Sequence, residues 1–378
     1  MKRLLLVCAL VLAQALLAVP GANAGTAPVY KVQLDGLPPK HDNWSFLRYF
    51  PRTITVHRGA VVEAAWAGAG APHTATMVPE ANADTWRQQN QDPGDPYAFV
   101  VPDSAVGGDD SENVVNPAAA FPSDPTCGSE AGNACAFDGT SVVNSGFMFG
   151  DPSNEPSFFV KMDAPVGTYS FLCLVHPGME MTVNVVGKGQ AVPTPSQIQA
   201  KATTQFAKAT NVWGPAADFQ AQQVVSGPVD GGHTSYTLWA GGFSHNVSAD
   251  EYPDKPLTIH VGDKVQFLGN YEIHTATIPA SSIGTVPLIT TQCEVPGPDT
   301  SATSPADCSD PTKFQIAFNN EAVVPSASST LTDPTAFVNS GLLSAPSSTT
   351  FVADAPGTYT VICLVHGPAM STTIKVAA

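Results

Sequence analysis

Basic side chains are scarce in this sequence of 378 residues. Lysine and arginine together number 16, against 32 aspartates and glutamates, so the formal net charge at pH 7 is −16. This balance argues against nucleic acid or an anionic membrane surface as a partner. It allows electrostatic steering toward a basic partner protein.

Long apolar runs are missing beyond the start of the chain. Residues 1–24 combine the basic pair Lys2 and Arg3, an apolar stretch, and the small-residue sequence Ala22-Asn23-Ala24, which is the pattern of a secretory signal peptide. The run is short for a membrane span and ends at Pro20. We therefore expect an exported protein, periplasmic or secreted, whose mature chain has no membrane span and a formal charge lowered from −16 to −18 by the loss of Lys2 and Arg3.

Helical periodicity is also scarce. Short runs of β-branched and aromatic residues lie between Pro, Gly, Asn and Asp instead, which predicts an all-β fold of the sandwich type. The length suits two domains of roughly 100–200 residues each. One helix is expected between them, because Thr194 and Pro195 resemble an N-cap and a first helical residue before SQIQAKATTQFAKA.

One stretch, residues 167–186, carries a concentration of chemistry. It reads GTYSFLCLVHPGMEMTVNVV and places Cys173, His176 and Met179 between two strand-like ends, with Met181 just beyond. Thiolate and thioether are soft ligands, and two histidines with one cysteine and a weak axial methionine form a blue copper site. The second imidazole is expected from His73, in the segment APHTATMVP.

The whole arrangement occurs twice. GTYTVICLVH, from residue 357, matches GTYSFLCLVH at seven of ten positions, and the HTAT segment at His73 recurs at His274. Packing alone explains neither histidine of each set. We therefore infer a second site formed by His274, Cys363, His366 and Met370, and two coppers per chain.

A threonine follows the first histidine of each set. The hydroxyls of Thr74 and Thr275 are positioned by sequence to bond the backbone of the cysteine loop and hold the site closed. An ordinary strand threonine is an equal alternative at both positions.

With these motifs the chain resembles the cupredoxins, the family of plastocyanin and amicyanin, twice in tandem. The HPGM loop that begins at His176 is most similar to the short ligand loop of amicyanin. The resemblance implies two Greek-key β-sandwich domains, one copper per complete site and one-electron transfer. We place the cupredoxin domains at residues 25–187 and 233–378, joined by a linker, residues 188–232, that contains the short helix.

The first domain offers two candidates for the axial ligand. Met179 follows the ligand histidine by three residues, as in amicyanin, whereas Met181 follows it by five, as in plastocyanin. Met370, the second domain's candidate, precedes the strand residue Ile374 by four positions, and Met179 precedes Val183 by the same number. This equal spacing to the following strand favours Met179 over Met181 as the axial ligand.

Six cysteines remain after the signal peptide, and two of them are the proposed ligands. In an exported chain we expect the other four to form two local disulfides, Cys127 with Cys135 and Cys293 with Cys308. Both pairs lie in long inserts rich in Asp, Pro, Gly and Ser, which predict loops. Each insert also contains VNSG, at residues 143–146 and 338–341, which we interpret as a structural turn without chemistry of its own.

Three classes of function fit these motifs. Copper nitrite reductases and two-domain laccases, also built from cupredoxin domains, need a further copper centre, usually connected by a histidine beside the ligand cysteine. Here leucine or isoleucine flanks both Cys173 and Cys363, and no His-x-His occurs. Methionine-rich or histidine-rich tracts, the usual sign of copper storage or delivery, are absent as well. We therefore predict electron transfer between redox protein partners, such as a cytochrome, by a protein that is not an enzyme; a two-domain copper enzyme and a storage protein are the alternatives.

Overall fold

The computed structural model describes residues 27–39, 43–68, 71–80, 100–102, 113–149, 156–176, 178–293 and 314–378. The predicted signal peptide and Cys308 lie outside these residues. No helix in the described ranges is long and apolar enough to cross a membrane.

The first half of the chain forms two five-stranded sheets. One has the order β3–β1–β5–β11–β9, with bounds Tyr49–Phe50, Val29–Leu34, Val61–Trp66, Ser157–Met162 and Cys135–Phe137. The other has the order β10–β6–β12–β13–β4, with bounds Val143–Asn144, Thr76–Val78, Gly167–Leu172, Glu180–Val186 and Thr53–His57. Alternate residues are buried along β4 and β13, because side chains of a strand point to opposite faces. Their buried faces and those of the first sheet share one hydrophobic core.

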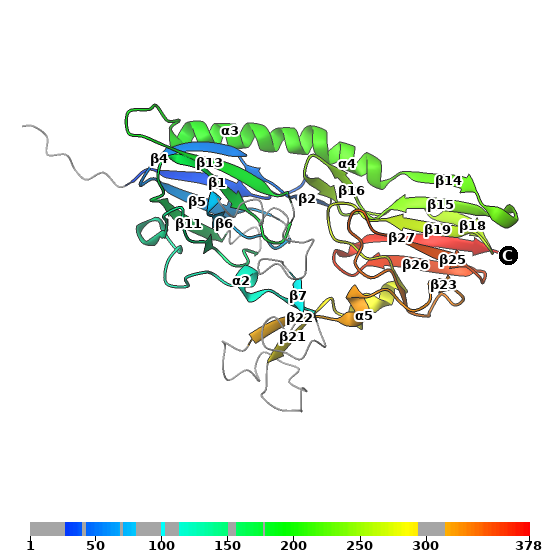
Figure 1. The fold of residues 1–378 in the computed structure, drawn as a ribbon. Coiled ribbons are helices and arrows are strands. Elements are labelled where there is room, and N and C mark those ends of the chain that lie inside the picture. Colours follow the sequence, from blue (N-terminus) through cyan, green and yellow to red (C-terminus); the bar gives the residue numbers. More distant parts are fainter. Residues whose placement is uncertain are drawn as a thin grey trace, which may run out of the picture.

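The second half repeats this arrangement. One sheet has the order β14–β15–β19–β25–β23, with bounds Val224–Pro228, Thr234–Trp239, Lys264–Leu268, Ser348–Ala353 and Thr330–Leu331. The other has the order β18–β27–β26–β20–β24, with bounds Leu257–His260, Gly367–Ala377, Gly357–Cys363, Thr277–Ile278 and Val338–Asn339. In both halves the same positions pair in parallel: β1 with β5 and β4 with β13, β15 with β19 and β18 with β27. The predicted tandem of cupredoxin-type β-sandwiches is confirmed (Figure 1).

Two further sheets join the halves. A three-stranded sheet pairs β2 (Trp44–Phe46) with β17 (Val247–Ala249), next to β16 (Gly242–Ser244). A four-stranded sheet pairs β8 (Asn113–Val115) with β22 (Phe314–Phe318), flanked by β7 (Val100–Pro102) and β21 (Ile289–Cys293). The inserts predicted as loops therefore contribute strands that pair across the two halves, on the lower side of Figure 1.

The connection between the sandwiches contains more structure than the one predicted helix. Helix α3 (Pro195–Lys208) begins with a capping box between Thr194 and Gln197, and continues through a π-helical turn (Ala209–Trp213) into α4 (Gly214–Ala221). The buried alanines of this segment pack on Trp44 and Phe46, which explains why it stays helical past Gly214 and Pro215. Figure 1 shows it along the upper side of the molecule. Strand β14 also lies in the predicted linker, so the domain boundaries stay a prediction.

Short helical turns complete the described structure. They are α2 (Pro117–Ala120), η3 (Ala131–Asn133), η5 (Asp230–Gly232), η6 (Ala280–Gly284) and α5 (Asn320–Val323). α2 and α5 occupy equivalent places in the two halves, each ahead of a VNSG segment.

Candidate metal centres

The structure gathers two equivalent groups of side chains. Site 1 consists of His73, Cys173 and His176, and site 2 of His274, Cys363 and His366. Within each group, the candidate ligand atoms all lie within 4.8 Å of one another. Among the described residues these are the only groups of three or more histidines, cysteines and acidic residues placed to hold a metal ion.

The atoms face one another in the same way at both sites. In site 1 the Cys173 sulfur lies 3.7 Å from Nδ1 of His73 and 3.6 Å from Nδ1 of His176, and the two Nδ1 atoms are 3.1 Å apart. In site 2 the distance from Cys363 sulfur to His366 Nδ1 is 3.6 Å, and the two Nδ1 atoms are again 3.1 Å apart.

Strand ends fix these ligands in place. Cys173 directly follows β12, and the loop after it closes tightly, with the Met179 amide donating to the His176 carbonyl and the Cys173 amide to the Met179 carbonyl. His73 is held by two backbone hydrogen bonds to Met148, of 3.0 and 2.7 Å. The isolated bridge between His274 and Leu343 repeats this arrangement in the second half.

The donor set fits a soft transition metal. Burial would raise the pKa of both thiols, but hydrogen bonds and charges from the flanking histidines lower it, to about 5 at Cys363 and well below the ordinary value at Cys173. A thiolate, the form that binds metal, is therefore favoured near neutral pH. Two buried imidazoles and a thiolate are the ligands of a blue copper centre, and the chain accordingly has two copper sites.

A relay of hydrogen bonds supports the cysteine loop of site 1. The backbone amide of Leu174 donates to Thr74 Oγ1 at 2.7 Å, and the Thr74 hydroxyl lies 3.0 Å from that of Thr76. The Thr76 hydroxyl donates to Asn144 Oδ1 at 2.7 Å. The Thr74 amide also points at the Cys173 sulfur, at 3.4 Å.

Site 2 has the same relay. The amide of Leu364 donates to Thr275 Oγ1 at 2.8 Å, and the chain continues through Thr277 to Asn339. Asn144 and Asn339 are the asparagines of the two VNSG segments, and each also donates its amide to three backbone carbonyls around α2 or α5. The sequence identified the repeat, but it did not show that its asparagine supports the site.

Carboxylates meet the outer nitrogens of three histidines. His73 Nε2 lies 3.2 Å from Asp35 Oδ2, His176 Nε2 lies 3.4 Å from Glu272 Oε1, and His366 Nε2 lies 3.8 Å from Asp250 Oδ2. Sequence reasoning missed all three acids, because none belongs to a repeated motif.

A cavity of about 550 Å³ lies between the two sandwiches. His176 of site 1 and His366 of site 2 both line it, together with the three acids named above. The other described lining residues are mostly apolar, among them Trp44, Ile273, Leu288, Phe318 and Leu342. The cavity is therefore bounded by an imidazole edge from each copper site.

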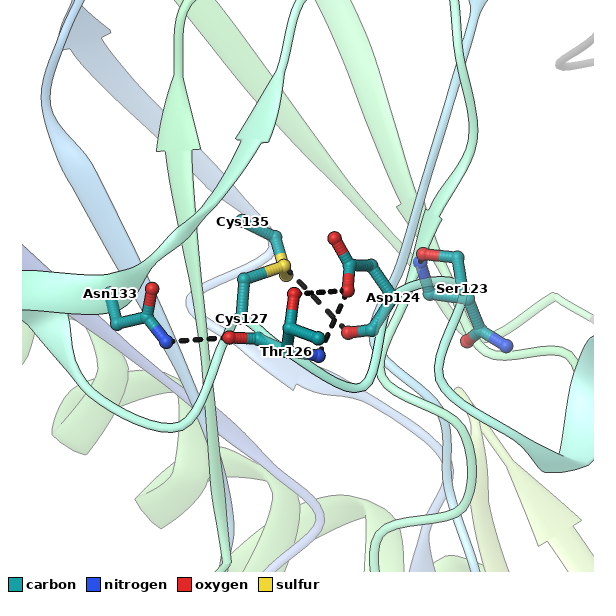
Figure 2. The surroundings of a disulfide bond; sticks show 7 residues. Ser123, Asp124, Thr126, Cys127, Asn133 and Cys135 are labelled. Atoms are coloured by element: carbon teal, nitrogen blue, oxygen red, sulfur yellow. Dashed lines mark hydrogen bonds between the residues drawn. A yellow bond between two sulfur atoms is a disulfide. The ribbon is translucent and has the colours of Figure 1, made fainter.

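Cys127 and Cys135 form a disulfide with an S–S distance of 1.96 Å. Figure 2 shows it beside Asp124, whose carboxylate accepts hydrogen bonds from the amide and hydroxyl of Thr126. The bond closes a short loop ahead of β9. The other predicted pair, Cys293 with Cys308, cannot be placed because Cys308 lies outside the described residues.

Comparison with protein-family models and with curated protein sequences finds no match. Among solved structures, auracyanin from Roseiflexus castenholzii is 16% identical, with 43% of this chain and 100% of auracyanin covered and a TM-score of 0.25. Blue copper oxidase from Nitrosomonas europaea is 12% identical, with coverages of 93% and 86% and a TM-score of 0.19. A copper-containing nitrite reductase from Thermus scotoductus is 14% identical, with coverages of 94% and 69% and a TM-score of 0.22.

The prediction that the chain is not an enzyme is wrong. The structures that align along both halves are copper oxidases and a copper nitrite reductase, whereas the auracyanin and plastocyanin matches cover less than half of the chain. The prediction depended on the residues beside the ligand cysteines, which show nothing of a cavity formed between two domains. At 9–14% identity these likenesses do not indicate a substrate.

Proposed function

We propose that the chain is a two-domain copper oxidoreductase whose copper sites receive electrons from a small reductant bound between the domains. Each predicted domain holds one type 1 copper. His73, Cys173, His176 and Met179 would hold the first copper, and His274, Cys363, His366 and Met370 the second.

The observation that carries this proposal is the shared cavity. A partly exposed histidine edge is where a blue copper centre exchanges electrons with its surroundings, and here His176 and His366 line one shared cavity. Its volume and its apolar walls with a few polar groups are typical of a small-molecule site. A reductant bound there contacts both electron acceptors in one binding event.

The chain's own residues keep the two sites rigid. Bound copper supplies the one-electron chemistry by alternating between its monovalent and divalent states. Fast exchange needs a ligand geometry that changes little between them. The relay from Leu174 through Thr74 to Asn144, and its counterpart in the second half, fixes the cysteine loop for this purpose.

A laccase-like or nitrite reductase-like reaction would need a further copper centre. The described residues hold four histidines outside the two sites, His57, His233, His245 and His260, and they form no third group. We therefore propose that the electrons leave to a redox protein partner. The excess of acidic residues favours a basic partner, such as a cytochrome.

The test is to block the cavity. Ala71 is half-buried on the cavity wall, so Ala71→Trp should obstruct it. Ala207→Trp, on the exposed side of α3, is the matched control. We expect hydroquinone to bleach the visible bands of both sites in the control, and at least about tenfold more slowly in Ala71→Trp, because the reductant can no longer approach both histidines. Equal rates in the two variants, each loaded with two coppers, would refute the proposed entry site.

A further inference from the structure

We propose that Glu272 connects the two copper sites and that site 1 passes its electron to site 2 through this residue. The inference rests on the two-copper function proposed above. It starts from the position of Glu272 in the chain, two residues before His274 of site 2, while its carboxylate contacts His176 of site 1.

The connection is short and buried. His176 uses Nδ1 toward the metal group, so the proton lies on Nε2 and is donated to Glu272 Oε1, 3.4 Å away. From that carboxylate the path runs along the backbone through Ile273 to His274, whose Nδ1 faces site 2. Both side chains at the contact are only 5% exposed. One hydrogen bond and otherwise only covalent bonds therefore separate the ligands of the two sites.

The Glu272 segment is fixed in place at this junction. The backbone amide of Glu272 donates to Asn270 Oδ1, which fixes the segment, and Oε2 has no hydrogen-bond partner. A buried, half-satisfied carboxylate is costly unless positive groups surround it. Here Glu272 lines the same cavity as a ligand histidine of each site, His176 and His366.

The two sites differ in how their histidines are supported. In site 1 both outer nitrogens meet a carboxylate, from Asp35 and Glu272. In site 2 the carboxylate nearest His366 is 3.8 Å away, beyond hydrogen-bond distance, and His274 Nε2 has no hydrogen-bond partner.

Gly241 explains the difference at His274. It lies beside His274 Nε2 as Asp35 lies beside His73 Nε2; Gly241 is two residues past β15 and Asp35 one residue past β1, and both have positive φ, 73° and 59°. A Cβ added to Gly241 would lie only 2.7 Å from His274 Nε2. The second half therefore has no side chain where the first half places an acid.

This asymmetry gives the transfer a direction. A carboxylate on the outer nitrogen makes a ligand histidine more basic, which stabilises divalent over monovalent copper. Site 1 should therefore have the lower reduction potential. In the step, copper(I) of site 1 is oxidised to copper(II), copper(II) of site 2 is reduced to copper(I), one electron crosses, and no proton is required.

The first experiment measures the two potentials. Cys363→Ser leaves only site 1 and Cys173→Ser leaves only site 2, so voltammetry of each assigns one potential. We expect the lower value for site 1. Glu272→Gln should raise it, by about 59 mV if the preference for copper(II) falls about tenfold, while Asp250→Asn, the matched control, should leave the potential of site 1 unchanged. A higher potential at site 1, or a larger effect of Glu272→Gln on site 2, would overturn the direction.

The second experiment measures the transfer itself. In a Met179→Gln background the changed axial ligand gives site 1 its own visible spectrum, and flash photoreduction supplies one electron per molecule. Glu272→Leu removes the hydrogen bond and should slow the transfer about ten- to hundredfold. Glu272→Gln retains an acceptor oxygen and reduces only the driving force, through the raised potential of site 1, so it should slow the transfer less than Glu272→Leu does. In the reduced protein, ¹⁵N NMR should show the hydrogen-bonded His176 Nε2 proton, and this signature should vanish in Glu272→Leu.

The outcomes separate this inference from the proposed function. If two coppers bind with full visible bands and the rate in Glu272→Leu is unchanged, the inference fails and the two-copper function stands. If copper does not bind or the bands are missing in the unsubstituted protein, the proposed function fails first. Should Glu272→Leu not fold, the potential of site 1 in Glu272→Gln still decides the direction of the transfer.

Discussion

Replacing Glu272 by glutamine should change how the copper-free protein responds to acid. The pKa of this carboxyl is lowered from an ordinary value of 4.5 to about 2, because the charges of nearby histidines outweigh the burial that would raise it. A carboxyl whose pKa is lower in the folded state contributes stability that is present above its unfolded pKa. That contribution is lost as the pH falls through the folded pKa.

The size of this contribution follows from the ordinary and the lowered pKa of Glu272. One pKa unit is worth about 1.4 kcal/mol, so Glu272 should contribute about 3 kcal/mol to the free energy of unfolding above pH 4.5 and nothing below pH 2. His176 does not change the pH dependence of the free energy of unfolding in this window. Its pKa is raised above 6.5, so it is protonated in both the folded and the unfolded protein there.

The assay is urea unfolding of the copper-free protein at several pH values between 2 and 5. From pH 2 to pH 5 the free energy of unfolding of the unsubstituted protein should rise by up to about 3 kcal/mol more than that of Glu272→Gln. Asp254→Asn, on an exposed position, controls for loss of one negative charge. Identical slopes for Glu272→Gln and the unsubstituted protein would refute the buried ion pair.

Three further predictions concern the supports of the sites. Thr74→Val should lower the free energy of unfolding by about 1–3 kcal/mol, because it leaves the buried amide of Leu174 without an acceptor; Thr74→Ser should restore the stability in urea unfolding, and failure of this rescue would contradict the relay. Met179→Leu should keep copper and raise the potential of site 1; a larger shift in voltammetry of Met181→Leu would instead identify that methionine as the axial ligand. Joint replacement of Cys127 and Cys135 by serine should lower the free energy of unfolding by about 2–3 kcal/mol for a loop of this length. The unsubstituted protein with its disulfide reduced should unfold at the same urea concentration as this variant. A clear difference between the two would show that the loss of stability has a cause other than the missing disulfide.

The ligand groups could be predicted from sequence because their signals are local and repeated. Cys-x-x-His at Cys173 and at Cys363 places two ligand atoms within one loop, and the HTAT repeat identifies the partner histidine of each. The strand pattern around the ligands is also local and repeated, so the two β-sandwiches could be predicted from it. Repetition also marked Asn144 and Asn339, although only the structure shows what they bond.

The features between the domains could not be predicted in this way. Glu272 reaches His176 only because the two sandwiches meet there, and nothing near either residue in the sequence encodes that meeting. The pairing of β2 with β17 has the same origin. Strand β14 was missed for a different reason: all five of its residues are exposed, so it has no alternation of apolar and polar side chains to recognise.

The most direct test of the account is a copper count combined with the visible spectrum of the oxidised protein and its cysteine variants. We expect two coppers and an intense thiolate-to-copper band in the unsubstituted chain, one copper and part of the band in Cys173→Ser and in Cys363→Ser, and no band in the double variant. A double variant that stays blue, or an unsubstituted protein that binds copper without this band, would contradict the assignment of two type 1 sites.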